Sequence, residues 1–274
     1  MPGVILAVVE SPETAARVLA AAQTLAELTS AARINVLAIR MPPIATIQPT
    51  EQIMTPEYAA QVRAREQART GALRDAYRAW SESARQTRIV AEWFDVEERA
   101  ELAVAEWGRR ADYVVLKRPW NRTPLPERQA IHSALFETDR PVLVVPPDLA
   151  PAPFGRRIAI AWREDERTIR AVLSALRWLS RAEGVFVLAG ALEGAPPVRL
   201  PEVFEEHCIE ADLHILRLTK QRVFGEALLA KAHELGADTL VMGAYVHQPI
   251  VRFVLGGVTR YMLTHADIPV LMRH

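Results

Sequence analysis

Glycine residues and a histidine gather in one stretch that could bind an anion, LVMGAYVHQPIVRFVLGGVTRYML at 240–263. A buried strand is expected to end at Gly243, and a loop carrying His247 leads to a helix entered near Gly256-Gly257. Glycines let a backbone approach a ligand closely, and the free N–H groups at a helix start favour phosphate. The alternative is that these glycines only permit tight turns and helix–strand packing, with His247 in solvent.

Other groups of potentially reactive side chains lack the spacing that a metal site or a catalytic site requires. His207 and Cys208 point in different directions on one helix, and Cys208 is expected to be a small buried apolar residue. His233-Glu234 lacks the second histidine of a helical zinc motif. The sequence contains no Gly-x-Ser-x-Gly elbow and no GxxxxGK[ST] loop. We therefore expect no dedicated catalytic centre, so that the protein is not an enzyme, and no metal site.

The amino-acid composition of the chain excludes some classes of binding partner. The 274 residues include 33 Lys and Arg and 33 Asp and Glu, so the formal net charge is zero. A neutral chain with no basic stripe interleaved with aromatic residues predicts no nucleic-acid partner. No basic residue precedes the apolar run Val4 to Val9, and no stretch approaches the roughly 18–20 apolar residues of a membrane span. With a single cysteine, the chain is expected in the cytoplasm and not in a membrane.

An internal repeat predicts two domains. Ala111-Asp112 begins a pattern of apolar run, loop, helix and Pro141 followed by a second apolar run. Ala237-Asp238 begins the same pattern, which ends at Pro269. The proline-rich segment 146–155 is a short linker, so we expect domains at 1–148 and 154–274.

The hydropathy pattern predicts alternating strands and helices in both halves. Most strands are continuous apolar runs, as a parallel sheet covered on both faces requires. This pattern favours an α/β fold with a doubly wound sheet in each half. The first half is longer because it contains an additional segment at 41–85, with a charged helix expected at 56–85. The expected strands are 4–9, 33–40, 87–94, 112–117, 141–146, 156–162, 184–190, 211–218, 238–243 and 268–272. The expected helices are 12–29, 56–85, 97–109, 126–136, 166–181, 201–208, 222–235 and 250–264.

The segment 237–272 resembles the universal stress protein family, UspA-like, in its tandem form. The family's phosphate pattern is Gly, two residues, Gly, nine residues, Gly, then Ser or Thr. Gly243 and Gly256 match its first and third glycines, whereas Val246 replaces the second and Gly257 replaces Ser or Thr. The resemblance implies Rossmann-like domains of the adenine nucleotide alpha hydrolase-like type, with ATP or another adenine nucleotide as the cofactor. The site residues are then Gly243, His247, Gly256, Gly257, Val258 and Thr259.

Two departures separate this chain from nucleotide-binding members of the family, which carry an Asp just after the first strand. Alignment puts Val9 at that position in the first half and Arg163 in the second. Arg128-Gln129 stands where the Gly-Ser pair of the first half belongs, so that half is expected to have lost its phosphate site. Lys117 and Arg118 either attract an anion or are solvated surface charges.

The last strands of the two halves, 141–146 and 268–272, are expected at sheet edges, where an apolar strand must be covered. The resemblance implies that universal stress domains pair through these strands. We expect the two halves to form an intramolecular pseudo-dimer in this way, and a further homodimer stays open.

The sequence thus predicts a stress-response protein that senses a ligand or binds a partner, with a nucleotide or anion site in its carboxyl-terminal half. One alternative is a weak nucleotide hydrolase, which needs a metal-binding carboxylate that 243–259 lacks. Another is a binding protein for a non-nucleotide metabolite or lipid-like fragment, held under helix 56–85.

Overall fold

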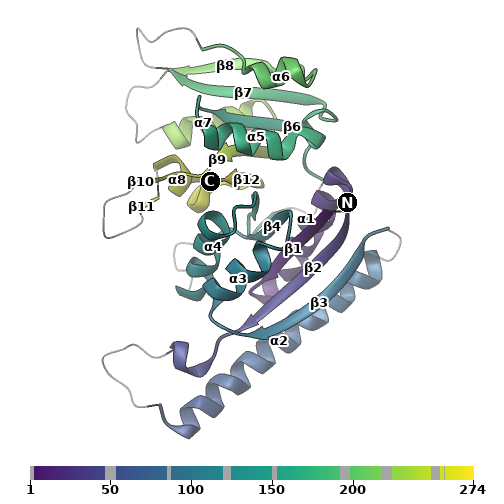
Figure 1. Cartoon of the computed structure of the whole chain (residues 1–274), viewed down its shortest axis with the longest axis vertical. Coiled ribbons are helices and arrows are strands. Elements are labelled where there is room, and N and C mark those ends of the chain that lie inside the picture. The colour runs from purple at the N-terminus through teal and green to yellow at the C-terminus, as the bar shows by residue number, and fades with distance from the viewer. Residues whose placement is uncertain are drawn as a thin grey trace. The chain divides into compact units, whose positions relative to one another are not determined.

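The chain forms two compact α/β units, Met1–Arg140 (unit 1) and Pro141–His274 (unit 2) (Figure 1). The structure, a computed structural model, describes residues 3–46, 54–84, 88–119, 125–149, 153–191, 198–217, 224–247, 254–255 and 257–274. In both units, strands and helices alternate along the chain, as the sequence predicts.

The strands of unit 1 form a parallel sheet in the order β3-β2-β1-β4. Most apolar residues of β1 and β4 are buried, and α1 and α3 both pack against β1. The strand order reverses between β1 and β4, and the carboxyl ends of these neighbours share one edge. The elements are β1 (Gly3–Val9), α1 (Pro12–Thr29), β2 (Ala31–Arg40), η1 (Pro43–Thr46), α2 (Pro56–Ala84), β3 (Val90–Glu97), α3 (Ala100–Gly108), β4 (Tyr113–Lys117) and α4 (Leu125–Glu137).

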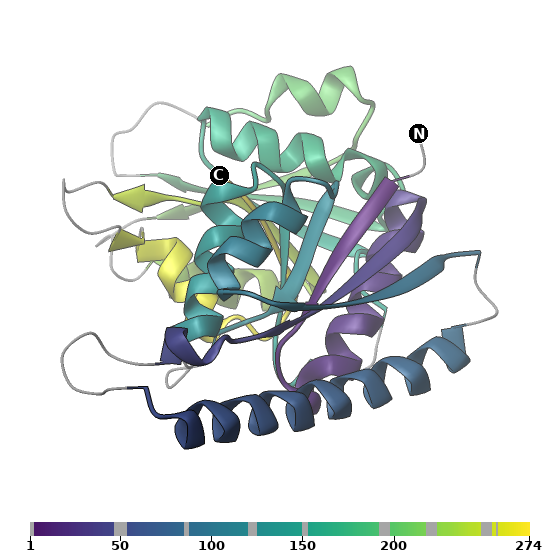
Figure 2. The same ribbon diagram turned by 60° about the horizontal axis from the view of Figure 1, so that its bottom comes forward.

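Helix α2, which the sequence predicts at 56–85, has 29 residues and is therefore about 43 Å long. Figure 2 shows it as the longest helix of unit 1, running beside α1. Leu73 is fully buried, and the Tyr77 ring lies 5.4 Å from the Trp93 ring of β3. The Trp80 indole donates to Gln23 of α1 at 3.1 Å. This half of α2 is therefore packed onto its own sheet.

Unit 2 repeats the arrangement in the order β5-β12-β9-β6-β7-β8, with β5 antiparallel to β12 and the other pairs parallel. Here the strand order reverses between β6 and β9. The elements are β5 (Val142–Val145), β6 (Arg157–Trp162), α5 (Glu166–Leu179), β7 (Gly184–Ala191), α6 (Glu202–Glu206), β8 (Asp212–Arg217), α7 (Phe224–Glu234), β9 (Thr239–Gly243), β10 (Val246–His247), β11 (Val254–Leu255), α8 (Gly257–His265) and β12 (Val270–Arg273).

Strand β5 lies in unit 2 and pairs with β12. Two details differ from the sequence-based expectations. The expected helix 250–264 begins only at Gly257, because Val254–Leu255 pairs antiparallel with β10. Cys208 is exposed, and its φ of 53° shows that the chain turns sharply after α6. The expectation of a buried cysteine was therefore wrong.

The repeated Ala-Asp pairs have a structural role at the amino ends of the strands. In unit 1 the Val4 amide donates to the Asp112 carboxylate at 2.7 Å. In unit 2 the Asp238 carboxylate accepts from the amides of Gly155, Arg156 and Arg157 at 2.7, 3.0 and 3.1 Å. Asp112 thus joins the start of β1 to that of β4, and Asp238 joins the start of β6 to that of β9.

Candidate functional site

Three polar side chains meet where the strand order of unit 2 reverses. Asp165 follows β6 and caps α5, accepting from the Thr168 amide at 3.0 Å. Tyr245 lies two residues beyond Gly243, the last residue of β9. Because β6 and β9 are parallel neighbours, both segments lie at the same edge of the sheet. In open α/β sheets, ligands bind at such a reversal of strand order. We call the residues gathered here, at the carboxyl ends of β6 and β9 and the start of α8, the unit 2 crevice.

The Tyr245 hydroxyl spans the unit 2 crevice. It donates to Asp165 and lies 2.7 Å from both carboxylate oxygens. It also lies 2.7 Å from the Thr168 hydroxyl, which is fully buried. Since the single phenol proton goes to Asp165, Thr168 donates to the phenol oxygen. The side chain from the β9 end is thereby fastened to the start of α5.

Burial raises the pKa of Tyr245 to about 12, and the hydrogen bond to Asp165 acts in the same direction. The bond from Thr168 and the charge of Arg163 oppose this rise without cancelling it. Deprotonation would place a phenolate against the Asp165 carboxylate, and two such charges repel. At neutral pH the hydroxyl is therefore a neutral donor.

The ring of Tyr245 rests on Gly243. A Cβ atom added to Gly243 would lie 2.8 Å from the Tyr245 hydroxyl oxygen and 3.0 Å from two ring carbons. Real Cβ atoms essentially never come as close as 2.8 Å to another heavy atom. In this conformation Gly243 therefore makes room for the chain's own tyrosine.

The start of α8 borders the same crevice. Thr259 is fully buried, and its hydroxyl accepts from the Tyr245 amide at 3.1 Å. Gly257 is exposed, and a Cβ added there would meet no described atom within 4 Å. The N–H groups of a helix's first turn lack partners within the helix. Gly257, Val258 and Thr259 thus present a helix start at the crevice.

Two arginines flank the tyrosine ring. The guanidinium carbons of Arg163 and Arg167 lie 5.1 and 5.5 Å from the Tyr245 ring centroid. Arg163 also pairs with Asp165 at 3.2 Å, and its side chain is 71% exposed. Their charges favour an anion beside the ring.

The structure describes four of the six predicted site residues in full. Gly243, Gly257, Val258 and Thr259 lie at the end of β9 or the start of α8. The backbone of His247 pairs with Val254, but its side chain lies outside the described residues, as does all of Gly256.

Sequence reasoning missed Asp165, Thr168 and Tyr245. The alignment stopped at Arg163, two residues before the carboxylate at the β6 end. Asp165 was detectable as an acidic N-cap directly before a predicted helix. Tyr245 gave no comparable signal, because its role depends on a partner 80 residues away.

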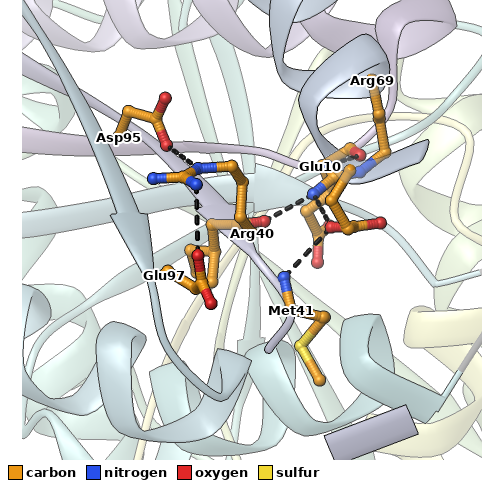
Figure 3. A network of polar contacts seen from close by, with 8 residues as sticks. Glu10, Arg40, Met41, Arg69, Asp95 and Glu97 are labelled. Atoms are coloured by element: carbon orange, nitrogen blue, oxygen red, sulfur yellow. Dashed lines mark hydrogen bonds and ion pairs between the residues drawn. The ribbon is translucent and has the colours of Figure 1, made fainter. Parts of the chain in front are cut away.

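The corresponding edge of unit 1 is occupied by its own side chains (Figure 3). Arg69 of α2 donates to the backbone oxygen of Glu10, the residue after β1, at 2.7 Å. It also pairs at 2.7 Å with Glu66, whose carboxylate accepts from the Met41 amide at 3.0 Å. Helix α2 is thus fastened to the ends of β1 and β2.

A second ion-pair group in Figure 3 joins the ends of β2 and β3. Arg40, the last residue of β2, lies 2.7 Å from Asp95 and 3.3 Å from Glu97. This group fixes the strand ends beside the Arg69 contacts.

Lys117, at the end of β4, pairs with Glu127 of α4 at 2.7 Å and donates to the Ser11 hydroxyl at 3.4 Å. Its side chain is only 14% exposed, so neither expectation for Lys117, a free anion site or a solvated charge, describes it. Arg128 lies inside α4, where the alignment expects the Gly-Ser pair.

Glu10 has the most perturbed carboxyl group at this edge. Burial raises its pKa to about 8, and the Glu127 carboxylate adds to the rise. The charges of Lys117 and Arg69 lower it but do not restore the ordinary value. Glu10 is therefore largely protonated at neutral pH.

Two searches of the described part of the chain gave no candidates. In that part, no group of three or more His, Cys, Asp or Glu side chains is arranged to hold a metal ion. No helix there has both the length and the hydropathy needed to cross a bilayer.

The fold and the crevice define a two-unit α/β protein with Rossmann-like sheets. Residues 211–274 match the universal stress protein family. Nearly the whole chain superposes on a universal stress protein from Archaeoglobus fulgidus, with a TM-score of 0.69 at 14% identity over 98% of this chain and 97% of that one. A putative universal stress protein from Pseudomonas aeruginosa gives 0.60 at 16% identity over 99% and 93%. No curated protein matches the sequence.

Residues 211–274 thus resemble the universal stress protein family, and the chain as a whole has the fold of these structures. The predicted resemblance and the predicted fold class are confirmed. The family suggests a role in stress response.

Proposed function

We propose that this protein binds an adenine nucleotide or a related anion in the unit 2 crevice and acts in stress response as a ligand sensor or interaction module. One observation carries the proposal. Asp165, Tyr245 and Thr259 join the ends of β6 and β9 to the start of α8, at the reversal of strand order. The helix start offers amide donors to a phosphate, and Arg163 and Arg167 add positive charge.

Unit 1 is the partner that does not bind nucleotide in this proposal. Arg69 takes up the backbone acceptor that follows β1, and Lys117 is paired with Glu127. A ligand would have to break these contacts before it reached the strand ends. We keep as a further proposal the intramolecular pseudo-dimer, in which the apolar strands 141–146 and 268–272 would cover each other's edges.

The proposal includes binding without a dedicated catalytic step, in the cytoplasm, with no nucleic-acid or membrane partner. Asp165 supports the first point. Its carboxylate caps α5 through the Thr168 amide and pairs with Arg163, and these contacts compete with the metal ion that hydrolysis needs.

Calorimetry with ATP, ADP and AMP tests nucleotide binding. The informative variant is Gly257→Glu, because a Cβ there meets no described atom within 4 Å and an acidic residue suits the first turn of a helix. The variant is expected to fold normally and to bind at least about tenfold more weakly, since its carboxylate repels the phosphate. Gly257→Ala is the matched control and should bind like the wild type.

Two results would contradict the proposal. Wild-type affinity weaker than about 1 mM for all three nucleotides would remove the nucleotide site. Equal affinity in Gly257→Glu and Gly257→Ala would place the ligand away from the start of α8.

A further inference from the structure

We propose that Tyr245 is a gate: its side chain occupies the unit 2 crevice, and a nucleotide binds only after this ring leaves Gly243 and its hydroxyl leaves Asp165. The inference rests on the proposed function and adds a residue that controls it. It concerns only residues of unit 2.

The Tyr245 ring fills the space above Gly243. The ring lies against Gly243, so close that not even a methyl group fits between them. A glycine at a strand end gives a ligand access to the backbone only where the space above it is open. In the conformation described, that space is filled by the ring, so a phosphate and the ring compete for the same volume.

The hydrogen bonds of the Tyr245 hydroxyl can be replaced by those of a nucleotide. The Tyr245 hydroxyl donates to Asp165 and accepts from Thr168. A nucleoside hydroxyl can replace both of these interactions, because it is a donor and an acceptor as well. Inorganic pyrophosphate at its anionic oxygens offers only acceptors, which the Asp165 carboxylate repels. Once open, the crevice therefore binds a nucleotide more readily than a bare polyphosphate.

The Tyr245 side chain can move without its backbone. The backbone of Tyr245 is held by Thr259, whereas the side chain is only partly buried and the flanking Arg163 is exposed. Rotation of the side chain can therefore carry the ring outward while the backbone stays in place. Such a closed state lowers the apparent affinity by the fraction of molecules that are open.

Nucleotide titrations of three variants test the gate. Tyr245→Ala removes the ring and should bind ADP about tenfold or more tightly than the wild type. Tyr245→Phe keeps the ring but loses its hydrogen bonds, so a smaller gain is expected. Tyr58→Ala, in α2 of unit 1, is the control and should leave the affinity unchanged. Pyrophosphate should gain from Tyr245→Ala by the same factor as ADP, because the fraction of open molecules sets this factor for any ligand that binds only the open state.

A direct readout of the ring accompanies the titrations. The chain contains five tyrosines, so fluorotyrosine labelling gives a small set of 19F signals, and Tyr245→Phe identifies the one from Tyr245. This signal should shift when ADP saturates the wild-type protein.

The outcomes separate the gate from the site. If the wild type and Tyr245→Ala bind ADP equally, or the 19F signal does not move at saturation, the gate is refuted and the nucleotide site remains. Weaker binding by Tyr245→Ala would also refute the gate, because the ring would then be part of the bound state. If no variant binds any nucleotide, the proposed function fails and the gate fails with it.

Discussion

Replacing Gly243 by alanine should set the new methyl group against the chain's own tyrosine. The methyl carbon would lie 2.8 Å from the Tyr245 oxygen and 3.0 Å from two ring carbons, so the ring must move. Its displacement would strain the hydrogen bonds to Asp165 and Thr168. Overpacking costs about 1–3 kcal/mol, and a hydrogen bond to a charged group contributes about 1.5–3 kcal/mol.

Because Tyr245 is only partly buried, we expect a combined loss of about 2 kcal/mol in the free energy of unfolding. The same change in a Tyr245→Ala background has no ring to displace. It should be close to neutral, so the coupling energy between the two sites should also be about 2 kcal/mol.

Urea denaturation of the wild type, both single variants and the double variant measures this coupling. Gly71→Ala is the matched control, because Gly71 lies inside α2 and a Cβ there meets nothing within 4 Å. It should stabilise the protein by about 0.5–1 kcal/mol. If the two changes at Gly243 and Tyr245 are additive, the ring does not rest on Gly243 and the description of the crevice is wrong.

Two further predictions concern stability. The pKa of Glu10 is raised from 4.5 to about 8, so the folded state binds its proton more tightly than the unfolded state between these values, and stability should fall as pH rises through that window. The Glu10→Gln variant should lose this decline, and parallel pH profiles for the two proteins would contradict it. Asp238→Ala removes three amide contacts and Asp112→Ala removes one, so their expected losses are about 2–3 and about 1 kcal/mol in urea denaturation. Equal losses would show that the contact number does not matter.

Local patterns predicted most of the fold. Continuous apolar runs give buried parallel strands, and the expected helix 56–85 agrees with α2. The predicted start of the helix 250–264 was wrong because an apolar stretch fits either a helix or a strand. The pairing of β10 with β11 decides between the two. The prediction of a buried Cys208 was wrong because residue type alone does not show that the chain turns there.

The site was predictable only in part. The glycine pattern located the end of β9 and the start of α8, because glycine spacing is a local property of the chain. The contents of the crevice depend on contacts between distant residues. Asp165 and Tyr245 meet only once the sheet has formed, and Arg69 reaches the end of β1 from a helix that follows β2.

The pairing of β5 with β12 has a consequence for dissecting the chain. A fragment cut at the proline-rich linker, beginning at 154, would lack β5 and leave the outer side of β12 bare. An unpaired apolar strand there invites association with any similar strand nearby. A fragment beginning at Pro141 would keep β5 paired with β12 and move the bare apolar edge to β5, so either fragment needs a cover on that side.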